Sequence, residues 1–353
     1  MKKKYILPTL LILQIVLLQI LKSYPEVTER YYSNGLYQWI AAISRTVFGK
    51  VPFSIGDIIY FILVITLLRW LYKNRKTWRI NWKDNLLKIV SIFSVTYFLF
   101  HLLWAINYYR VPLYKKMAIE RKYSEEQLIT FTKKLINKTN EIHHQIVSND
   151  SVKVTFPYTE QQIFDKNIDG YKNLSSQYPF FSYEHPSIKK SLISTPLTYM
   201  GFSGYLNPFT GEAQVNDRVP LYNFPTTACH EMAHQIGYAS ESEANFIGYL
   251  ASIKNNDMYF KFSGYSFALK HCLNVLEKME EGKSKTLLPL INKGIRKNFK
   301  ESHEFWESHQ TFIEPGFKFF YDNFLKFNSQ KDGLESYSKF VDLMVNYYKY
   351  KPL

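Results

Sequence analysis

The amino-acid sequence predicts a mainly α-helical protein with a small β-sheet, in which an α-helical membrane region precedes an α+β domain. Three observations lead to this fold class. Long aliphatic runs are confined to residues 1–110, helical patterns dominate residues 111–353, and one stretch with alternating Thr, Tyr and Val and several glycine breakers indicates short strands. A chain of 353 residues is long enough for both parts to bury a core.

The N-terminal third contains three apolar stretches, at about residues 5–21, 52–70 and 87–107. A membrane-spanning helix needs about 20 apolar residues, within a range of about 17–25, so each stretch can cross a bilayer. The first stretch follows a basic start as a signal peptide would. However, Leu21-Lys22-Ser23-Tyr24 offers no small-residue cleavage site, which favours an uncleaved anchor. We therefore predict three transmembrane helices.

The net charge of +14 is concentrated around these stretches. Residues 1–110 hold 15 Lys and Arg against 4 Asp and Glu, a net charge of +11, which leaves +3 for residues 111–353. This placement, with no nucleic-acid-binding motif, argues against a nucleic-acid partner and for a lipid bilayer. Basic residues precede the first stretch and separate the second from the third, so both segments are expected in the cytoplasm. Residues 111–353 then form an extracytoplasmic domain, periplasmic in a Gram-negative cell, anchored in the bacterial inner membrane.

The C-terminal part carries recognisable helix and strand signals. A Ser-x-x-Gln capping box opens a predicted helix over residues 124–147, and a second helix is expected over residues 160–176. Residues 212–216 have the composition of a strand. The only cysteines, Cys229 and Cys272, are too few for a disulfide framework. We expect both to be small buried residues, although pairing between them stays open.

The motif that carries chemistry is His230-Glu231-Met232-Ala233-His234. Histidines at positions i and i+4 lie on one face of a helix, where both can bind one zinc ion. Glu231 projects beside them and can take a proton from a water that the metal acidifies, which makes it the candidate catalytic base. Thr226 is expected as the N-cap of this helix, and Gly237 is expected to end it in a left-handed turn.

A catalytic zinc site has three protein ligands, and two carboxylates follow the motif. Ser240 and Glu243 match a capping box, which would give Glu243 a structural task. Glu241 begins a helix whose small residues, including Gly248, would let it approach the motif helix closely. We therefore favour Glu241 as the third ligand, with Glu243 as the alternative. Asn245 could accept a hydrogen bond from a ligand histidine.

The order His230-Glu231-x-x-His234 and then Glu241-x-x-Ala244-Asn245 resembles the gluzincin zinc metallopeptidases, in which the first Glu of the second motif is the third ligand. Residues 208–213, 243–247 and 333–337 are similar to one bacterial group of three-span membrane proteins that has a zincin-like domain and unknown function. The segment between His234 and Glu241 is shorter than in many gluzincins, so Glu243 remains the alternative third ligand. The resemblance implies a zincin-like α+β catalytic domain with one Zn²⁺ per chain.

The same resemblance implies a place for a peptide or protein substrate. The strand before the motif helix in zincins is an edge that pairs with extended peptides, and Glu212-Ala213-Gln214-Val215-Asn216 fits that place. An internal strand is the alternative. The transition-state oxyanion needs a donor besides the metal, and the candidate donors are Tyr199, Tyr205, Tyr238 and Tyr337.

The function expected from the sequence is a membrane-anchored zinc metallopeptidase, a hydrolase that cleaves peptide bonds. The alternative is a catalytically inactive zinc-binding membrane protein that acts as a structural or sensory module. A transporter is disfavoured because the spans carry no charged pathway residues. The motif lies far beyond the third span in the chain, which favours a soluble or surface substrate. The sequence carries no signal for the oligomeric state.

Overall fold

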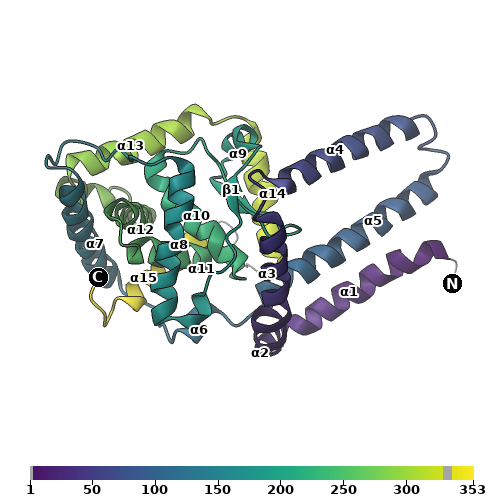
Figure 1. Cartoon of the computed structure of the whole chain (residues 1–353), viewed down its shortest axis with the longest axis horizontal. Helices are drawn as coiled ribbons and strands as arrows, with labels where there is room; N and C mark the ends of the chain where they lie inside the picture. Colours follow the sequence, from purple (N-terminus) through teal and green to yellow (C-terminus); the bar gives the residue numbers. More distant parts are fainter. Residues whose placement is uncertain (1–2, 329–335) are drawn as a thin grey trace.

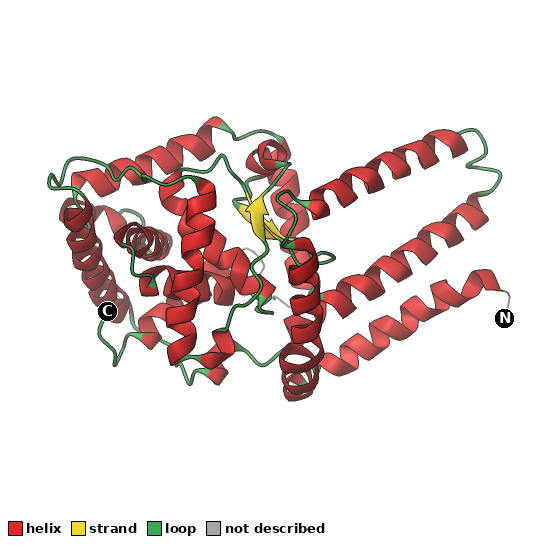
Figure 2. Cartoon of the chain, in the orientation of Figure 1, coloured by secondary structure: helices red, strands yellow, loops and turns green. Residues whose placement is uncertain are grey.

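The computed structural model describes residues 3–328 and 336–353, and it confirms a mainly α-helical fold with one small β-sheet (Figures 1 and 2). Three long helices, α1 (Ile6–Lys22), α4 (Ile55–Asn74) and α5 (Trp82–Leu103), extend from one side of a helical domain. A π-helix (Thr28–Leu36) and α3 (Tyr37–Phe48) lie between α1 and α4 in the chain. The remaining α-helices are α2 (Pro25–Val27), α6 (Leu113–Lys116), α7 (Glu125–Ile146), α8 (Glu160–Gln177), α9 (Ser194–Met200), α10 (Phe224–Gln235), α11 (Glu241–Lys254), α12 (Met258–Met279), α13 (Lys293–Ser308), α14 (Ile313–Phe327) and α15 (Ser336–Tyr347).

Two or three of the long helices are long and apolar enough to cross a membrane. Helices α4 and α5 each meet this condition alone, while α1 does so only when it is joined to the segment after it, from which it is separated by a bend of 98°. The third predicted span was expected to reach residue 107. Instead α5 ends at Leu103, and a 3-10 turn (Ala105–Tyr109) leads into the domain.

The two basic segments of the N-terminal third lie at the same end of the long helices. The N-terminus and the connection between α4 and α5 lie at the ends that point away from the domain (Figure 1). Lys4 Nζ is 3.1 Å from Asp84 Oδ1, so the basic N-terminus is close to the start of α5. The two basic segments that the sequence places on one side of a membrane are therefore on one side of the structure.

The sheet has three strands, β1 (Ile188–Lys190), β2 (Gly204–Leu206) and β3 (Ala213–Val215), in the order β1-β3-β2. β3 pairs parallel with β1 and antiparallel with β2. The predicted strand at Glu212–Asn216 therefore exists, but its assignment as a substrate-binding edge is wrong. Both sides of β3 are already hydrogen-bonded within the sheet, and all its residues are buried.

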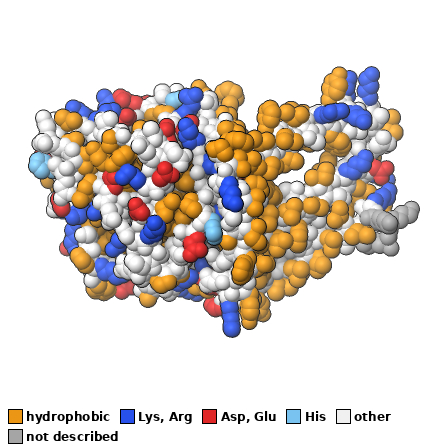
Figure 3. Space-filling model, viewed as in Figure 1, with side chains coloured by type: hydrophobic (Ala, Val, Ile, Leu, Met, Phe, Trp, Pro, Cys, Tyr) orange, Lys and Arg blue, Asp and Glu red, His pale blue; other side chains and the backbone are white. Residues whose placement is uncertain are grey.

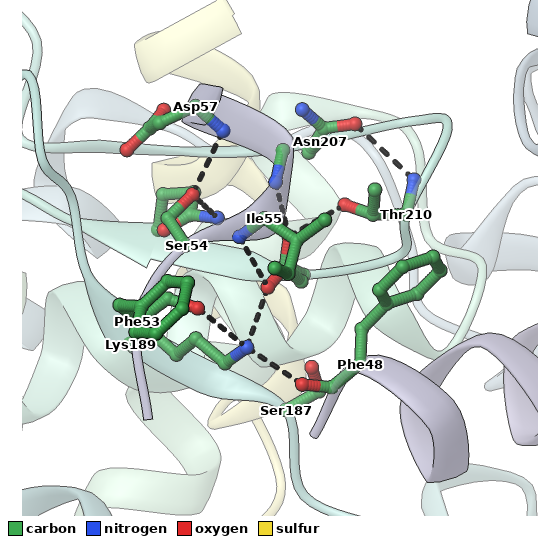
Figure 4. A network of polar contacts seen from close by, with 12 residues as sticks. Phe48, Phe53, Ser54, Ile55, Asp57, Ser187, Lys189, Asn207 and Thr210 are labelled. Carbon is green, nitrogen blue, oxygen red and sulfur yellow. Dashed lines mark hydrogen bonds and ion pairs between the residues drawn. The ribbon is translucent and has the colours of Figure 1, made fainter. Parts of the chain in front are cut away.

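A buried ion pair attaches α4 to this sheet (Figure 4). Lys189 Nζ lies 2.5 Å from Glu212 Oε1, and both side chains are almost fully buried. The Glu212 carboxylate also accepts hydrogen bonds from the backbone N–H groups of Ile55 (3.1 Å) and Gly56 (2.6 Å). Because the first N–H groups of a helix have no partner within it, a carboxylate at this position satisfies them and stabilises the helix start. Glu212 is thus a structural residue rather than a substrate contact.

A second carboxylate, Asp57, connects the first turn of α4 to the strands. Its Oδ2 accepts hydrogen bonds from Ser191 Oγ (3.0 Å) and from the Leu192 N–H (2.7 Å). Its Oδ1 accepts one from the Tyr205 hydroxyl of β2. The start of α4 and the edge strand β2 are consequently held in one arrangement.

Replacement of Glu212 by Gln should destabilise the protein strongly, because it leaves the Lys189 ammonium buried without its counter-charge. Breaking a buried ion pair in this way costs about 3–5 kcal/mol. Thermal unfolding of detergent-solubilised protein should show the lower midpoint. Glu304→Gln is the matched control, since its ion pair with Lys300 is exposed and exposed pairs contribute little. Equal midpoints for the two variants would contradict this role of Glu212.

Candidate metal centre

Helix α10 carries the motif histidines, and its ends are set by local sequence. It begins at Phe224 with Pro225 in its first turn, where the missing N–H of proline costs no hydrogen bond. The predicted N-cap, Thr226, lies inside the helix, and its hydroxyl is 2.8 Å from Ser263 Oγ. The expected left-handed turn after the helix is present, with Gly237 at φ +89°.

The structure brings His230, His234 and Glu241 together. The two Nε2 atoms are 3.1 Å apart. Glu241 Oε2 lies 3.3 Å from His230 Nε2, and Glu241 Oε1 lies 3.6 Å from His234 Nε2. Tetrahedral zinc with bonds of about 2.0–2.1 Å separates its ligand atoms by about 3.3 Å, so these three side chains fit one ion as they stand. Glu231 completes a cluster with the two histidines whose potential ligand atoms all lie within 4.8 Å of one another.

Close contact between α10 and α11 positions Glu241. A Cβ atom added at Gly248 of α11 would lie 2.8 Å from the backbone nitrogen of His230, so a larger residue would push the helices apart. Glu243 has a different place, since its Oε1 accepts a hydrogen bond from the Leu113 N–H at 2.6 Å. The expected capping box with Ser240 does not form, because the Glu243 side chain reaches the start of α6 instead.

Hydrogen bonds and burial set the state of the two histidines. His234 Nδ1 is 2.7 Å from the Tyr238 carbonyl oxygen, so this nitrogen carries the proton and Nε2 presents its lone pair to the cluster. Burial lowers the pKa of His234 to about 4. Burial also acts to lower the pKa of His230, but Glu241, Glu231 and Asn245 outweigh it and raise that pKa. Asn245 lies beside His230, as expected, and its hydrogen bond is one of the interactions that raise this pKa.

Glu231 is buried beside the two histidines, and Gly204 of β2 provides the space for it. A Cβ atom at Gly204 would lie 2.7 Å from Glu231 Oε1 and equally close to the backbone oxygen of Gln214. Burial raises the pKa of the Glu231 carboxyl to about 8. Within the described part of the chain, Glu231 Oε2 makes no hydrogen bond. A carboxyl group in this position can exchange a proton with a molecule in the adjoining cavity.

One residue of the site, Tyr321 of α14, was missed by the sequence reasoning. Its hydroxyl donates a hydrogen bond to Glu241 Oε1 at 2.7 Å across 80 positions of the chain. Burial acts to raise the pKa of Glu241, but the two histidines and Tyr321 outweigh it and lower that pKa to about 2. No local pattern around Tyr321 marks it among 28 tyrosines. Only the packing of α14 beside the cluster identifies it.

The tyrosines expected as oxyanion donors lie elsewhere or are already engaged. The Tyr205 ring lines the cavity, but its hydroxyl binds Asp57. Tyr238 packs against the Arg110 guanidinium, 4.0 Å from the ring centroid. Tyr199 packs against His309, and the side chain of Tyr337 lies outside the described residues.

The N-terminal third holds the end of the motif helix. The Trp104 indole N–H donates a hydrogen bond to the His234 carbonyl oxygen at 3.1 Å, and the Tyr37 hydroxyl donates to that of Gln235 at 3.0 Å. These carbonyls lack partners inside α10 because they belong to its last turn. All the candidate ligands lie within residues 111–353, but the helix that carries the two histidines is also held by residues of the N-terminal third.

A cavity of about 1720 Å³ adjoins the cluster and is lined by His230, Glu231, His234 and Glu241. Ligand pockets commonly measure about 300–1,000 Å³, so this one can accept a molecule larger than a typical small ligand. Its walls also include Tyr60 of α4, together with Phe100 and Trp104 of α5 and its following turn.

Fold and cluster together define a helical protein in which membrane-length helices and a His-Glu-His group that could hold a metal share one cavity. The chain belongs to the family described as "Protein of unknown function (DUF3810)", whose profile matches residues 32–345. The match includes α4, α5 and the whole candidate metal centre. No curated protein and no solved structure matches the chain.

Metal analysis of purified variants should show which of the two carboxylates, Glu241 or Glu243, is the third zinc ligand. Glu241→Ala should weaken zinc binding by more than the roughly 10–100-fold typical of residues that only support a ligand. Glu243→Ala should keep the zinc content of the wild type and lower thermal stability, because the Leu113 N–H loses its partly buried acceptor. A Glu243→Ala protein without zinc beside a zinc-loaded Glu241→Ala protein would reverse the assignment.

Proposed function

We propose that this protein is a membrane-anchored zinc-dependent peptidase. The observation that carries the proposal is the convergence of His230, His234 and Glu241, with separations of 3.1–3.6 Å, beside the buried carboxyl of Glu231. A bound zinc ion would supply a Lewis acid that polarises a carbonyl and acidifies a water. The resemblance to gluzincins supports the same reaction class.

The chain's own residues have distinct tasks in this proposal. Glu231 is the general base, since it lies beside the ligands and one of its oxygens has no partner in the described structure. His234 is held in one tautomer by the Tyr238 carbonyl, and Glu241 is oriented by the Tyr321 hydroxyl. These contacts restrict the rotamers of the ligands, which keeps the site in a geometry suited to reaction.

The substrate backbone is proposed to lie along β2. This strand pairs with β3 on one side only, and its residues Gly204, Tyr205 and Leu206 line the cavity next to the cluster. An extended peptide that added itself to this edge would form backbone hydrogen bonds while its scissile carbonyl faced Glu231. In this proposal β2, and not the segment 212–216, is the edge strand that pairs with an extended substrate.

The proposed location is the bacterial inner membrane, with the domain on the extracytoplasmic side. The basic ends of the long helices lie together, away from the domain (Figure 1). Basic flanks remain in the cytoplasm during insertion, so the opposite ends and the domain would lie outside.

Glu231→Gln should abolish turnover while zinc content stays at the wild-type level. Loss of a general base typically lowers the rate by about 10²–10⁴-fold. Cleavage of a fluorogenic peptide library by the reconstituted protein, with metal analysis of the same sample, measures both quantities. Glu301→Gln is the matched control, because Glu301 pairs with Lys153 on the surface. Wild-type cleavage by Glu231→Gln would refute the assigned role.

Metal removal distinguishes this proposal from a non-catalytic zinc module in which the ion fixes the fold. Because α10 and α11 pack directly and the Trp104 indole N–H bonds the end of α10, we expect the apo-protein to stay folded. Chelation should stop cleavage and leave the helical circular dichroism signal intact, and added zinc should restore activity. Unfolding on chelation would instead favour a structural role for the metal.

A further inference from the structure

We propose that α14 lies in the lipid–water interface and that substrate reaches the metal centre from there, so that the substrate is an amphipathic or lipid-anchored polypeptide. This inference rests on the proposed peptidase function and narrows its substrate class. It departs from the expectation that distance along the chain between the spans and the motif favours a soluble substrate.

One side of α14 exposes large aromatic side chains. Phe319 and Phe327 are 74% and 71% exposed, and Phe312 just before the helix is 92% exposed; Phe320, at 66%, lies between this side and the cavity. Contiguous apolar surface of this kind is unusual on a domain surrounded by water and marks an interaction site. The same helix carries the ion pair of Lys318 with Glu314, so it is amphipathic in the way that helices lying in a bilayer surface are.

The position of α14 identifies the bilayer as its partner. The helix lies at the junction where α4 and α5 meet the domain (Figure 1). Its Phe324 ring contacts the Phe100 ring of α5 with centroids 5.9 Å apart. Figure 3 shows hydrophobic side chains over the long helices that continue onto the adjoining face of the domain. If α4 and α5 cross a bilayer, α14 is at the level of its interface.

The opposite side of α14 belongs to the metal cavity. Tyr321 binds the candidate ligand Glu241, and further aromatic residues of α14 form a wall of the cavity. Aromatic residues of the long helices line the same space. The aromatic lining contributed by these elements consists of Tyr60, Phe100, Trp104, Phe317, Phe320, Tyr321 and Phe324.

A single helix therefore has one face toward lipid and one face toward the candidate zinc ligands. An aromatic wall that runs from the long helices to the cluster is suited to apolar side chains or an acyl chain, and a highly charged soluble peptide would gain little from it. A substrate held at the bilayer surface would also be concentrated next to the cavity by its own partitioning.

The placement of α14 is tested without any reference to catalysis. The full chain is reconstituted in phosphatidylcholine vesicles after attachment of a fluorophore at Phe319→Cys, and a mixture of lipids brominated near the headgroup and near the end of the acyl chain serves as the quencher. Cys229 and Cys272 are buried, which directs labelling to the introduced thiol. Leu67→Cys on α4 is the lipid-exposed control, and Lys300→Cys on α13 is the solvent-exposed control.

We expect the label at position 319 to be quenched to at least half the extent seen at position 67, while the label at position 300 is unaffected. Quenching at position 319 no stronger than at position 300 would overturn the interfacial placement of α14, and with it the proposed access route.

The substrate class is tested with one fluorogenic peptide library in two forms, free and N-terminally palmitoylated, added to the same vesicles. The acylated form should be cleaved at least about tenfold faster, because its acyl chain holds it at the surface. Phe319→Glu should reduce this advantage while cleavage of the free form and the zinc content stay unchanged.

Equal cleavage of the two forms would overturn the proposed substrate class. Absence of cleavage of both forms by zinc-loaded protein, with the label at position 319 quenched, would overturn the peptidase function and support the interfacial placement of α14. The two failures are therefore distinguishable.

Discussion

The close packing of α10 on α11 is the constraint on which the candidate metal centre depends. It requires a glycine at position 248, since any Cβ there would meet the backbone nitrogen of His230 at 2.8 Å. At this separation Glu241 reaches both imidazoles from the first turn of α11, with no long insertion between the two motifs. The short connection between the two motifs is therefore long enough for Glu241 to reach the histidines.

Residues 1–110, which contain the membrane-length helices, contribute directly to this arrangement. Trp104 and Tyr37 cap the last turn of α10, and Arg110 bridges from the Gly237 carbonyl to the Glu29 carboxylate with bonds of 2.8 Å at each end. Glu212 and Asp57 hold the start of α4 against the sheet beside the same site. The orientation of the long helices and the geometry of the cluster are consequently linked through buried polar contacts, whose loss is costly because the partner groups stay buried.

Local patterns predicted much of the fold. The Ser124 capping box opens α7 as expected, and Gly237 adopts the left-handed conformation that ends the motif helix. The i, i+4 spacing of His230 and His234 placed both imidazoles on one face, because helix geometry depends only on neighbours within a turn or two. The small residues of α11 also predicted correctly that it packs closely against α10.

Errors arose wherever a role depended on partners far along the chain. Glu212 lies in a segment with the sequence pattern of a substrate-binding strand. Its carboxylate instead pairs with Lys189 and accepts a hydrogen bond from the start of α4. Glu243 matched a capping box, yet its carboxylate accepts a partly buried hydrogen bond from the Leu113 N–H at 2.6 Å instead. The chain itself determined the helices, the membrane-length stretches and the two histidines, since these follow from composition and short-range periodicity. Tertiary structure alone decided that β3 is central, that Tyr321 binds Glu241, and that α14 adjoins both the long helices and the cavity beside the candidate metal centre. Such contacts join residues distant in sequence, and no local pattern records them.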